Sequence, residues 1–248
     1  MSTPQAKQGS ALVPFGVVIA AGLVISVSIA VKTFERVKLG YGTITVKGYA
    51  EKRITSDMAA WWGNFSARSA NLVDAYDKLE KDLGIVLSYL EKHGVKREDM
   101  NVSSISTAVL YVKDEKGEDT NQIEGYVLGQ SVDLTSPDVA LVTTIAGDST
   151  SLIKEGVEFR SGEPQYFYSK LEDLKLEMLA AATKDAHARA AEIASNSGVK
   201  VGPPRSAQQG VFQITTPYST DVSGYGRYDT STIDKSIKAI VAVEYSIR

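Results

Sequence analysis

The chain has 248 residues, of which 43% are hydrophobic and 23% are charged, so it can bury an ordinary core and is not a disordered polypeptide. It has no cysteine and only two histidines, His93 and His187, which excludes disulfides, thiol catalysis and metal sites with four nitrogen or sulfur ligands. Positions 1–38 hold four basic residues and one acidic residue, which leaves 23 basic and 29 acidic residues for the remainder. The resulting net negative charge of residues 39–248 disfavours nucleic acid as a partner.

An uncharged apolar run covers residues 11–31. As a helix it would extend about 31 Å, which matches the hydrocarbon core of a bilayer at about 30 Å. We therefore expect a transmembrane anchor at 11–31, preceded by a tail at 1–10 and followed by a juxtamembrane linker at 32–41. A cleaved signal peptide is the competing interpretation, but the run exceeds the usual 7–15 apolar residues of such peptides. A buried helix of a soluble protein is the third, disfavoured by a proline and two glycines in the run.

Two features of the anchor bear on assembly and orientation. Gly22, Ser26 and Ala30 recur at steps of four, and small residues at this spacing let helices approach closely in lipid.

Basic residues follow the anchor more often than they precede it, so the positive-inside rule alone would place the following domain in the cytoplasm. The difference amounts to one or two charges, which is a weak bias.

After the linker, residues 43–47 alternate between polar and apolar and predict a first strand that ends at Gly48. Residues 54–67 predict a second strand, which we expect to pair with the first. Apolar residues then recur at steps of three and four from Leu72 to Leu90, the pattern of an amphipathic helix. Ser69 or Asn71 is the expected N-cap of this helix.

A hairpin is predicted next, because strands at 101–112 and 123–134 flank a segment rich in turn residues. Ser136 and Pro137 then have the order of an N-cap and a first helical residue, which predicts a short helix. A strand is expected at 157–168.

The longest predicted helix spans residues 170–196. Ala182, Ala186, Ala190 and Ile193 fall on one face of its second half, where the alanines should let it lie close to whatever it covers. Strands are expected at 207–216 and 236–247, separated by a long polar loop. Strand pairs interrupted by helices indicate an α+β fold, in which helices pack on one face of a mainly antiparallel sheet. We assign this fold to one domain, residues 42–248.

The sequence offers little for catalysis. His93 ends a predicted helix, where the helix dipole favours a histidine, and His187 is expected at the surface or in an interface. Residues 129–133 resemble the nucleophile turn of serine hydrolases but lack its final glycine and lie in a predicted strand. Phosphate-binding, dinucleotide-binding and zinc-protease motifs are missing from the sequence. We therefore expect no catalytic residue, no metal site and no cofactor, and the sequence identifies no small-molecule ligand.

Three tyrosines, Tyr218, Tyr225 and Tyr228, are crowded into the polar loop at 216–232, which is rich in glycine and serine. Tyrosine combined with serine and glycine is typical of adaptable protein contact surfaces. We therefore treat this segment as a candidate interaction loop. The alternative is a flexible loop with incidental aromatic residues.

One set of short segments has a characteristic order and spacing along the chain. Its members are Ile44–Gly48, Asp57 with Trp61, His93–Val95 with Asp99 and Val102, Gly156–Phe159, Gln165–Tyr168 with Leu171, Leu174 and Lys175, then Ala182, Asp185–Ala186, Ala190 and Ala194, Ser197–Gly198 and Gln208–Ile214. This order and spacing resemble the SIMPL-domain family, in particular its membrane-anchored bacterial envelope members. A proline before Asp57 is common in that family, whereas this chain has Ser56.

The resemblance implies an extracytoplasmic α+β domain without an established catalytic site, which often self-associates and is loosely linked with stress tolerance. It also implies export, so we expect a single-pass inner-membrane protein whose C-terminal domain lies in the periplasm, against the charge bias. The expected partners are the lipid bilayer and further copies of the chain, for which a closed ring is one arrangement. An envelope hydrolase with an unrecognised site, or a tethered scaffold that presents the tyrosines to another protein, are the alternatives.

Overall fold

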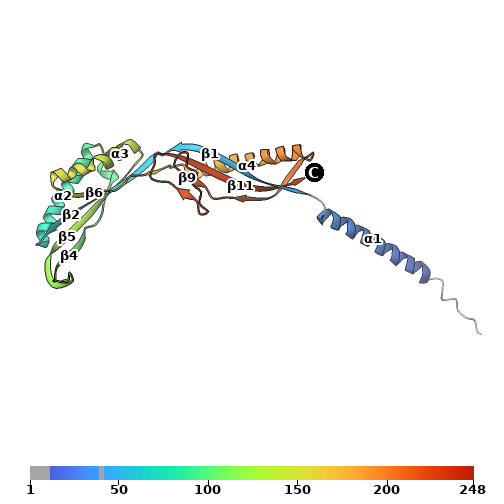
Figure 1. The fold of residues 1–248 in the computed structure, drawn as a ribbon, viewed down its shortest axis with the longest axis horizontal. Coiled ribbons are helices and arrows are strands. Elements are labelled where there is room, and N and C mark those ends of the chain that lie inside the picture. Colours follow the sequence, from blue (N-terminus) through green and yellow to red (C-terminus); the bar gives the residue numbers. More distant parts are fainter. Residues whose placement is uncertain (1–11, 39–41) are drawn as a thin grey trace, which may run out of the picture. The chain divides into compact units, whose positions relative to one another are not determined.

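A computed structural model describes residues 12–38 and 42–248, so the expected tail at 1–10 lies outside the described residues. The described part has a mixed α+β fold (Figure 1). Its helices are α1 (Leu12–Lys38), α2 (Leu72–Lys92), α3 (Val139–Asp148) and α4 (Leu171–Asn196), with short 3₁₀ helices η1 (Arg97–Asp99) and η2 (Ser149–Glu155). Its strands are β1 (Thr43–Thr55), β2 (Met58–Ser69), β3 (Met100–Val102), β4 (Ser106–Lys113), β5 (Asp119–Ser136), β6 (Glu158–Ser161), β7 (Gln165–Phe167), β8 (Val201–Gln209), β9 (Gln213–Thr215), β10 (Arg227–Tyr228) and β11 (Asp234–Ile247).

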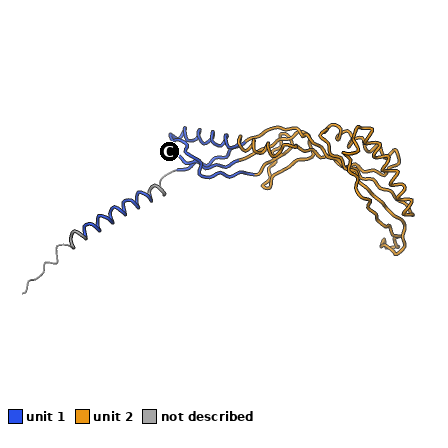
Figure 2. Tube along the Cα trace, turned by 180° about the vertical axis from the view of Figure 1, so that it is seen from behind, with its two compact units in different colours: residues 1–49, 182–210, 241–248 blue, residues 50–181, 211–240 orange. Residues whose placement is uncertain are grey.

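The chain divides into two compact units, which Figure 2 colours separately. Unit 1 comprises residues 1–49, 182–210 and 241–248, and unit 2 comprises residues 50–181 and 211–240. The strands form two sheets instead of the one sheet that the sequence suggested. One has the order β1-β11-β9-β10 with β8 also on β11, and the other has the order β3-β5-β2-β6 with β4 on β5 and β7 on β2. Only the β9–β10 pair among the described pairings is parallel, so the mainly antiparallel α+β fold is confirmed.

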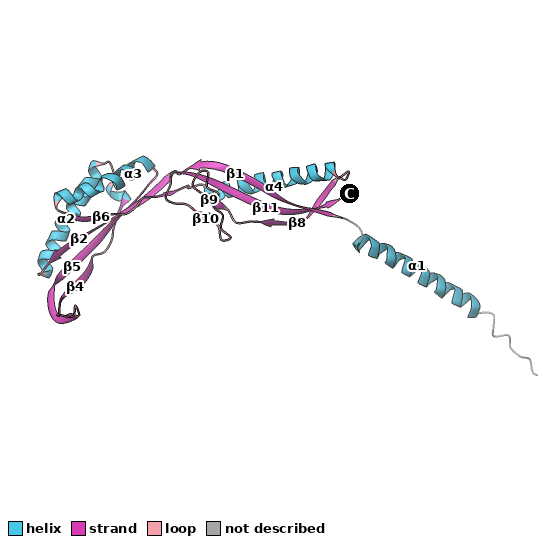
Figure 3. Ribbon diagram, viewed as in Figure 1, coloured by secondary structure: helices cyan, strands magenta, loops and turns pink. Residues whose placement is uncertain are grey.

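The six-stranded sheet of unit 2 is covered on one face by α2 and α3 (Figure 3). Strand β2 shows why, because its odd-numbered side chains from Ala59 to Ala67 are buried and the even-numbered ones between them are more exposed. Trp61 and Phe65 on that face are almost completely buried and pack with Leu79 of α2 and Ile145 of α3 in one hydrophobic core. The other face of the sheet carries polar side chains.

The helix caps explain where the helices of unit 2 begin. Asn71 caps α2, and its side chain accepts a hydrogen bond from the Val73 N–H at 2.8 Å, so one of the two expected caps is confirmed. For α3 the cap is Asp138 instead of Ser136, because the Asp138 carboxylate accepts from the Leu141 N–H at 2.9 Å. The helix therefore begins two residues later than the proline pattern predicts.

The expected pairing of the first two strands is wrong. β1 continues through the predicted stop at Gly48 and lies beside β11, whereas β2 pairs with β5, β6 and β7. At the junction the Ser56 N–H donates to the Ile233 carbonyl at 2.9 Å and the Asp57 N–H donates to the Phe167 carbonyl at 3.0 Å. Because residues 56 and 57 bond to distant segments, β1 and β2 enter different sheets and form no hairpin.

Three other predicted strands are interrupted. The strand expected at 157–168 is divided into β6 and β7 around residues 162–164, which include a glycine and a proline that break a strand. The strand expected at 207–216 is likewise divided into β8 and β9. The strand expected at 101–112 is divided into β3 and β4, and β4 forms the predicted hairpin with β5. The final strand is confirmed.

Unit 1 contains the close approach that the alanines of α4 predict. A Cβ atom on Gly48 of β1 would lie 2.0 Å from the carbonyl oxygen of Ala182 and 2.6 Å from the backbone nitrogen of Ala186. The helix backbone therefore lies directly on the strand at this glycine. The buried row continues through Ala190 to Ala194, while Ile193, which we expected on this face, is exposed.

We expect Gly48→Ala to destabilise the protein by about 1–3 kcal/mol, because the added methyl group has no space between β1 and α4. Gly84→Ala is the matched control, since Gly84 lies in the exposed middle of α2 with no atom within 4 Å of an added Cβ. This control should stabilise the protein by about 0.8–1 kcal/mol through helix propensity. Thermal unfolding of both variants measures the difference, and equal shifts would contradict the close packing.

Candidate functional site

The tyrosine loop, residues 216–232, is held by the strands on either side of it. β10 lies within the loop and pairs with β9, and the Asp229 N–H donates to the Ile214 carbonyl at 2.9 Å. The buried side chain of Gln213 donates to the Ser223 carbonyl at 2.7 Å and accepts from the Ser223 N–H at 3.3 Å. The loop is therefore fixed at its middle as well as at its ends.

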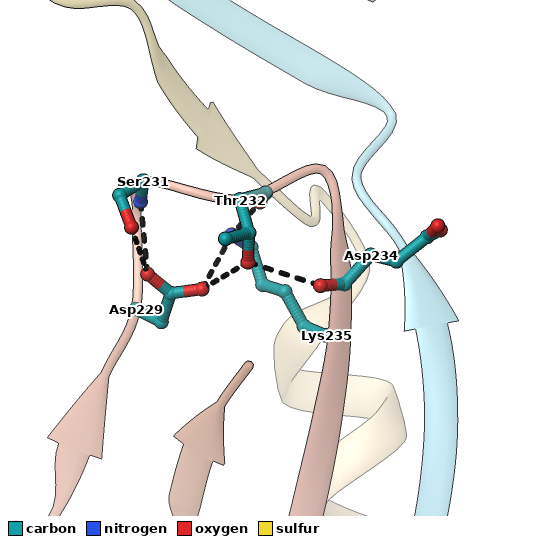
Figure 4. A network of polar contacts seen from close by, with 5 residues as sticks. All are labelled: Asp229, Ser231, Thr232, Asp234 and Lys235. Carbon is teal, nitrogen blue, oxygen red and sulfur yellow. Dashed lines mark hydrogen bonds and ion pairs between the residues drawn. The ribbon is translucent and has the colours of Figure 1, made fainter. Parts of the chain in front are cut away.

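A network of polar contacts fixes the C-terminal end of the loop (Figure 4). The Asp229 carboxylate accepts hydrogen bonds from the Ser231 N–H at 3.0 Å, from the Ser231 hydroxyl at 2.7 Å and from the Thr232 hydroxyl. Lys235 at the start of β11 is only 1% exposed, and its ammonium group donates to the Thr232 carbonyl and lies 3.6 Å from Asp229. The network closes the loop onto β11.

The pKa values of Asp229 and Lys235 are both shifted by their surroundings in this network. Burial alone would raise the pKa of Asp229, but hydrogen bonds from Thr232 and Ser231 and the nearby Lys235 ammonium outweigh burial and lower it. Burial lowers the pKa of Lys235, and the attraction of Asp229 offsets part of that change. Both groups are engaged within the fold, so the geometry indicates a structural clamp.

The structure places the three predicted tyrosines in different surroundings. Tyr225 is fully exposed, and Tyr218 is 80% exposed with a positive φ of 65° and the Arg53 guanidinium 4.4 Å from its ring centre. Tyr228 is more covered, and its ring stacks on Phe167 with centres 6.5 Å apart. No ring contact joins the three within the described residues. The loop thus presents Tyr218 and Tyr225 outward, while Tyr228 helps to fix it.

Sequence reasoning missed a small hollow beside the loop and the clamp next to it. The hollow has a volume of about 380 Å³, and it is lined by Thr215, Thr216, Ser219, Asp221, Arg227, Tyr228, Asp229, Thr230 and Ser231. The clamp had a signal in the sequence, because Lys235 occupies the same phase as the buried Ile237 and Ala239 of β11. A lysine at a buried phase of a strand indicates a buried partner.

The residues considered for catalysis have structural roles. His93 is the C-cap of α2, and its Nδ1 lies 2.8 Å from the Tyr89 carbonyl oxygen. His187 lies on the surface of α4 with its ring edge against Tyr245, at a distance of 5.6 Å between centres. Residues 129–133 lie within β5, as expected. Within residues 12–38 and 42–248, no three His, Asp or Glu side chains are placed to hold a metal ion together.

The apolar helix α1 is long enough to cross a membrane. Its segment Gly16–Phe34 has a mean hydropathy of 2.2 and none of it is buried in the protein. The hydroxyl of Ser28 donates to the Val24 carbonyl at 2.7 Å, which satisfies it within the helix. The helix continues to Lys38, so most of the expected linker is helical. Gly22, Ser26 and Ala30 all lie in the exposed segment, and their role as a contact line stays a prediction.

A comparison with protein families finds a match over most of the chain. The family model is SIMPL, described as a protein of unknown function (DUF541), and it matches residues 44–242. The match covers about four fifths of the chain, from β1 into β11, and α1 lies outside it. No curated protein matches the chain.

The clamp predicts that its two charged members respond differently to substitution. Asp229→Asn leaves the buried Lys235 without its counter-charge and should cost about 3 kcal/mol. Lys235→Met should cost less, because Ser231 and Thr232 still donate to Asp229. Asp221→Asn, which breaks only an exposed ion pair to Arg227, should cost no more than about 1 kcal/mol. Urea unfolding at pH 7 measures all three.

The same variants have a pH signature. Without Asp229, the pKa of Lys235 in the folded protein falls further below its value in the unfolded chain. Between these two pKa values the unfolded chain binds more protons than the folded protein. The free energy of unfolding therefore rises with pH in this range. Asp229→Asn should therefore gain more stability than the unaltered protein as the pH rises toward 10.5, the ordinary pKa of lysine. Parallel pH profiles would show that Lys235 is not a buried charge.

Proposed function

The chain belongs to the SIMPL family, a family of unknown function, and from this premise we propose that it is a membrane-anchored envelope protein that assembles with further copies of itself. In this proposal α1 holds the protein in the inner membrane and the domain that follows lies on the periplasmic side. The domain acts as a structural or binding module and carries out no reaction of its own.

Membrane anchoring is supported by the surface of α1. The segment Gly16–Phe34 exposes large aliphatic side chains all along the helix, including Val18, Leu23 and Ile29. An exposed apolar surface of this length is unfavourable in water and favourable in a bilayer. A cleaved signal sequence has the same composition, so the experiment below must distinguish the two.

Self-association is supported by the tyrosine loop, and the observation that carries it is the full exposure of Tyr225 in a loop that is fixed on both sides. A rigid loop loses little conformational entropy when it is buried at an interface, and tyrosine supplies a large contact area. A second copy is the favoured partner, because anchoring confines all copies to one plane in the same orientation and raises their effective concentration.

An exposed strand edge offers a second contact for assembly. Within the described residues β4 pairs only with β5, and the tip of this hairpin exposes Val109, Tyr111, Val112 and Ile123. Unpaired edges with apolar side chains are the surfaces through which sheets extend from one chain to the next. Addition of a strand from a second copy would cover this edge.

The proposal of a module without catalysis is supported by the histidines, the usual bases of a hydrolase. His93 is engaged at the end of α2 and His187 lies against Tyr245. Alanine replacement of both separates this proposal from the hydrolase alternative, because a histidine-dependent reaction would be lost while assembly would be retained.

The topology can be tested by reporter fusions. With the anchor in the membrane and the domain exported, alkaline phosphatase fused after Arg248 should be active, and a cytoplasmic reporter at the same site should be inactive. Membrane fractions should retain the full-length mass, since cleavage would remove α1. The reverse reporter pattern would restore the orientation that the positive-inside rule favours.

Assembly can be tested by sizing the full-length protein in mild detergent. We expect an assembly of several copies that dissociates when Tyr218, Tyr225 and Tyr228 are replaced together by serine. Tyr76→Ser is the matched control, since Tyr76 is 46% exposed but lies on α2, and it should leave the assembly intact.

Two outcomes would redirect this proposal. If Gly22→Leu with Ala30→Leu dissociates the assembly and the serine variant does not, the small-residue line of α1 is the contact. A full-length protein that runs as a monomer at micromolar concentration would contradict self-association and favour a scaffold for a different partner.

A further inference from the structure

The six-stranded sheet has α2 and α3 on one face (Figure 3). Its opposite, open face carries an ordered set of polar side chains. Asn64 of β2 pairs with Ser131 of β5 on one side and with Arg160 of β6 on the other. One step along, Ser66 pairs with Gly129 and Glu158. The neighbours Phe65, Val132 and Phe159 are buried in the core, so these polar residues project from the opposite face.

This face is hollowed. A cavity of about 630 Å³ lies over it, within the size range of pockets that hold small molecules. Ser103 and Ser104, between β3 and β4, and Ser106 at the start of β4 form one wall, and Gly129 contributes no side chain to the floor. We call this cavity the polar hollow.

The wall of the polar hollow is held rigidly. The Ser103 N–H donates to the Ser131 carbonyl at 3.0 Å, and the Ser131 N–H donates to the Ser103 hydroxyl at 2.9 Å. Gln130 donates to the Ser103 carbonyl at 2.9 Å, and Ser106 donates to the Gly129 carbonyl at 3.1 Å. A wall that is already ordered reduces the entropy cost of binding.

Five polar side chains in the polar hollow have no partner among the described residues. Within the described residues, those of Asn64, Ser66, Ser131, Glu158 and Arg160 make no hydrogen bond or ion pair with the protein. Arg160 and Glu158 stand two positions apart on β6 but form no salt bridge. Five free polar groups of both charges around one cavity can all serve a ligand.

An aromatic side chain borders this array. Trp62 precedes Asn64 on the same face of β2 and is 37% exposed. Its ring lies across Gly162, where an added Cβ atom would be 2.3 Å from the Trp62 Cε2, and the Gly162 N–H donates to the Trp62 carbonyl at 2.9 Å. The indole therefore lies over Gly162, two residues along the chain from Arg160, and is next to the cavity without lining it.

We propose that the polar hollow and Trp62 bind an acidic saccharide. Amide and hydroxyl groups pair with sugar hydroxyls, and a flat indole surface packs against the apolar face of a sugar ring. Arg160 supplies a guanidinium that pairs with a carboxylate through two hydrogen bonds. Glu158 and the nearby Asp133 disfavour strongly charged polyanions, so one carboxylate per sugar ring suits this site better than a polyphosphate.

Fluorescence provides a direct readout, because the chain has two tryptophans and Trp61 is buried in the core. Titration of the full-length protein with tri-galacturonate should saturate and change the emission of Trp62. The neutral maltotriose should bind at least several-fold more weakly. Inorganic phosphate should not displace tri-galacturonate.

Variants assign the contacts. Arg160→Gln should weaken tri-galacturonate binding about tenfold or more without changing maltotriose binding, because it removes only the charged contact. Asn64→Ala should weaken both ligands. Arg68→Gln is the matched control, since Arg68 is exposed on the same face of β2 but does not line the polar hollow. It should leave both affinities unchanged.

Three results would overturn the proposal. If tri-galacturonate shows no saturable binding at millimolar concentration, no saccharide binds here. If Arg160→Gln and Arg68→Gln lose equal affinity for tri-galacturonate, the attraction is non-specific. If phosphate displaces tri-galacturonate at equal concentration, the site accepts any anion. Unchanged melting temperatures of the exposed variants establish that the comparison concerns folded protein.

Discussion

Ser56 and Asp57 tie their own junction to two segments of unit 2 that are distant in the sequence, residues 167–169 and Ile233. The Asp57 N–H donates to Phe167 at the end of β7, and its carboxylate accepts from the N–H and hydroxyl of Ser169 at 2.6 and 2.8 Å, just before α4 begins. The adjacent Ser56 N–H holds Ile233 at the end of the tyrosine loop. The directions in which β2, α4 and β11 leave this point therefore depend on two consecutive residues.

Ser56 shows a compromise at this junction. Its hydroxyl is buried and has no partner within the described residues, which carries a cost of about 1–3 kcal/mol. Proline, which is common at this position in the proteins that the chain resembles, would avoid that cost but has no N–H to donate to Ile233. The serine thus retains a backbone bond to the loop at the expense of an unsatisfied side chain.

Local signals in the sequence predicted the elements that depend on local physics. Apolar residues that recur at steps of three and four predicted α2, and Asn71 predicted where this helix begins. The alanine row predicted that α4 packs closely on its neighbour, which is β1. The pairing of β1 with β11 was not predictable in this way, because it joins opposite ends of the domain and leaves no mark in either strand. The polar hollow was missed for the same reason. Asn64, Ser131 and Arg160 each look like ordinary solvent-facing residues until the register aligns them.

The alanine row of α4 has a consequence for the position of the helix along its own axis. Ala182, Ala186, Ala190 and Ala194 are so alike that a shift by one helical turn would replace each alanine by another against β1. The row itself therefore does not define a unique register. A shift by one turn toward the C-terminal end is opposed by Met178, because this side chain is too large for the position that Ala182 holds against Gly48. The axial register in this direction is therefore set by one large side chain at the start of the row and not by the alanines.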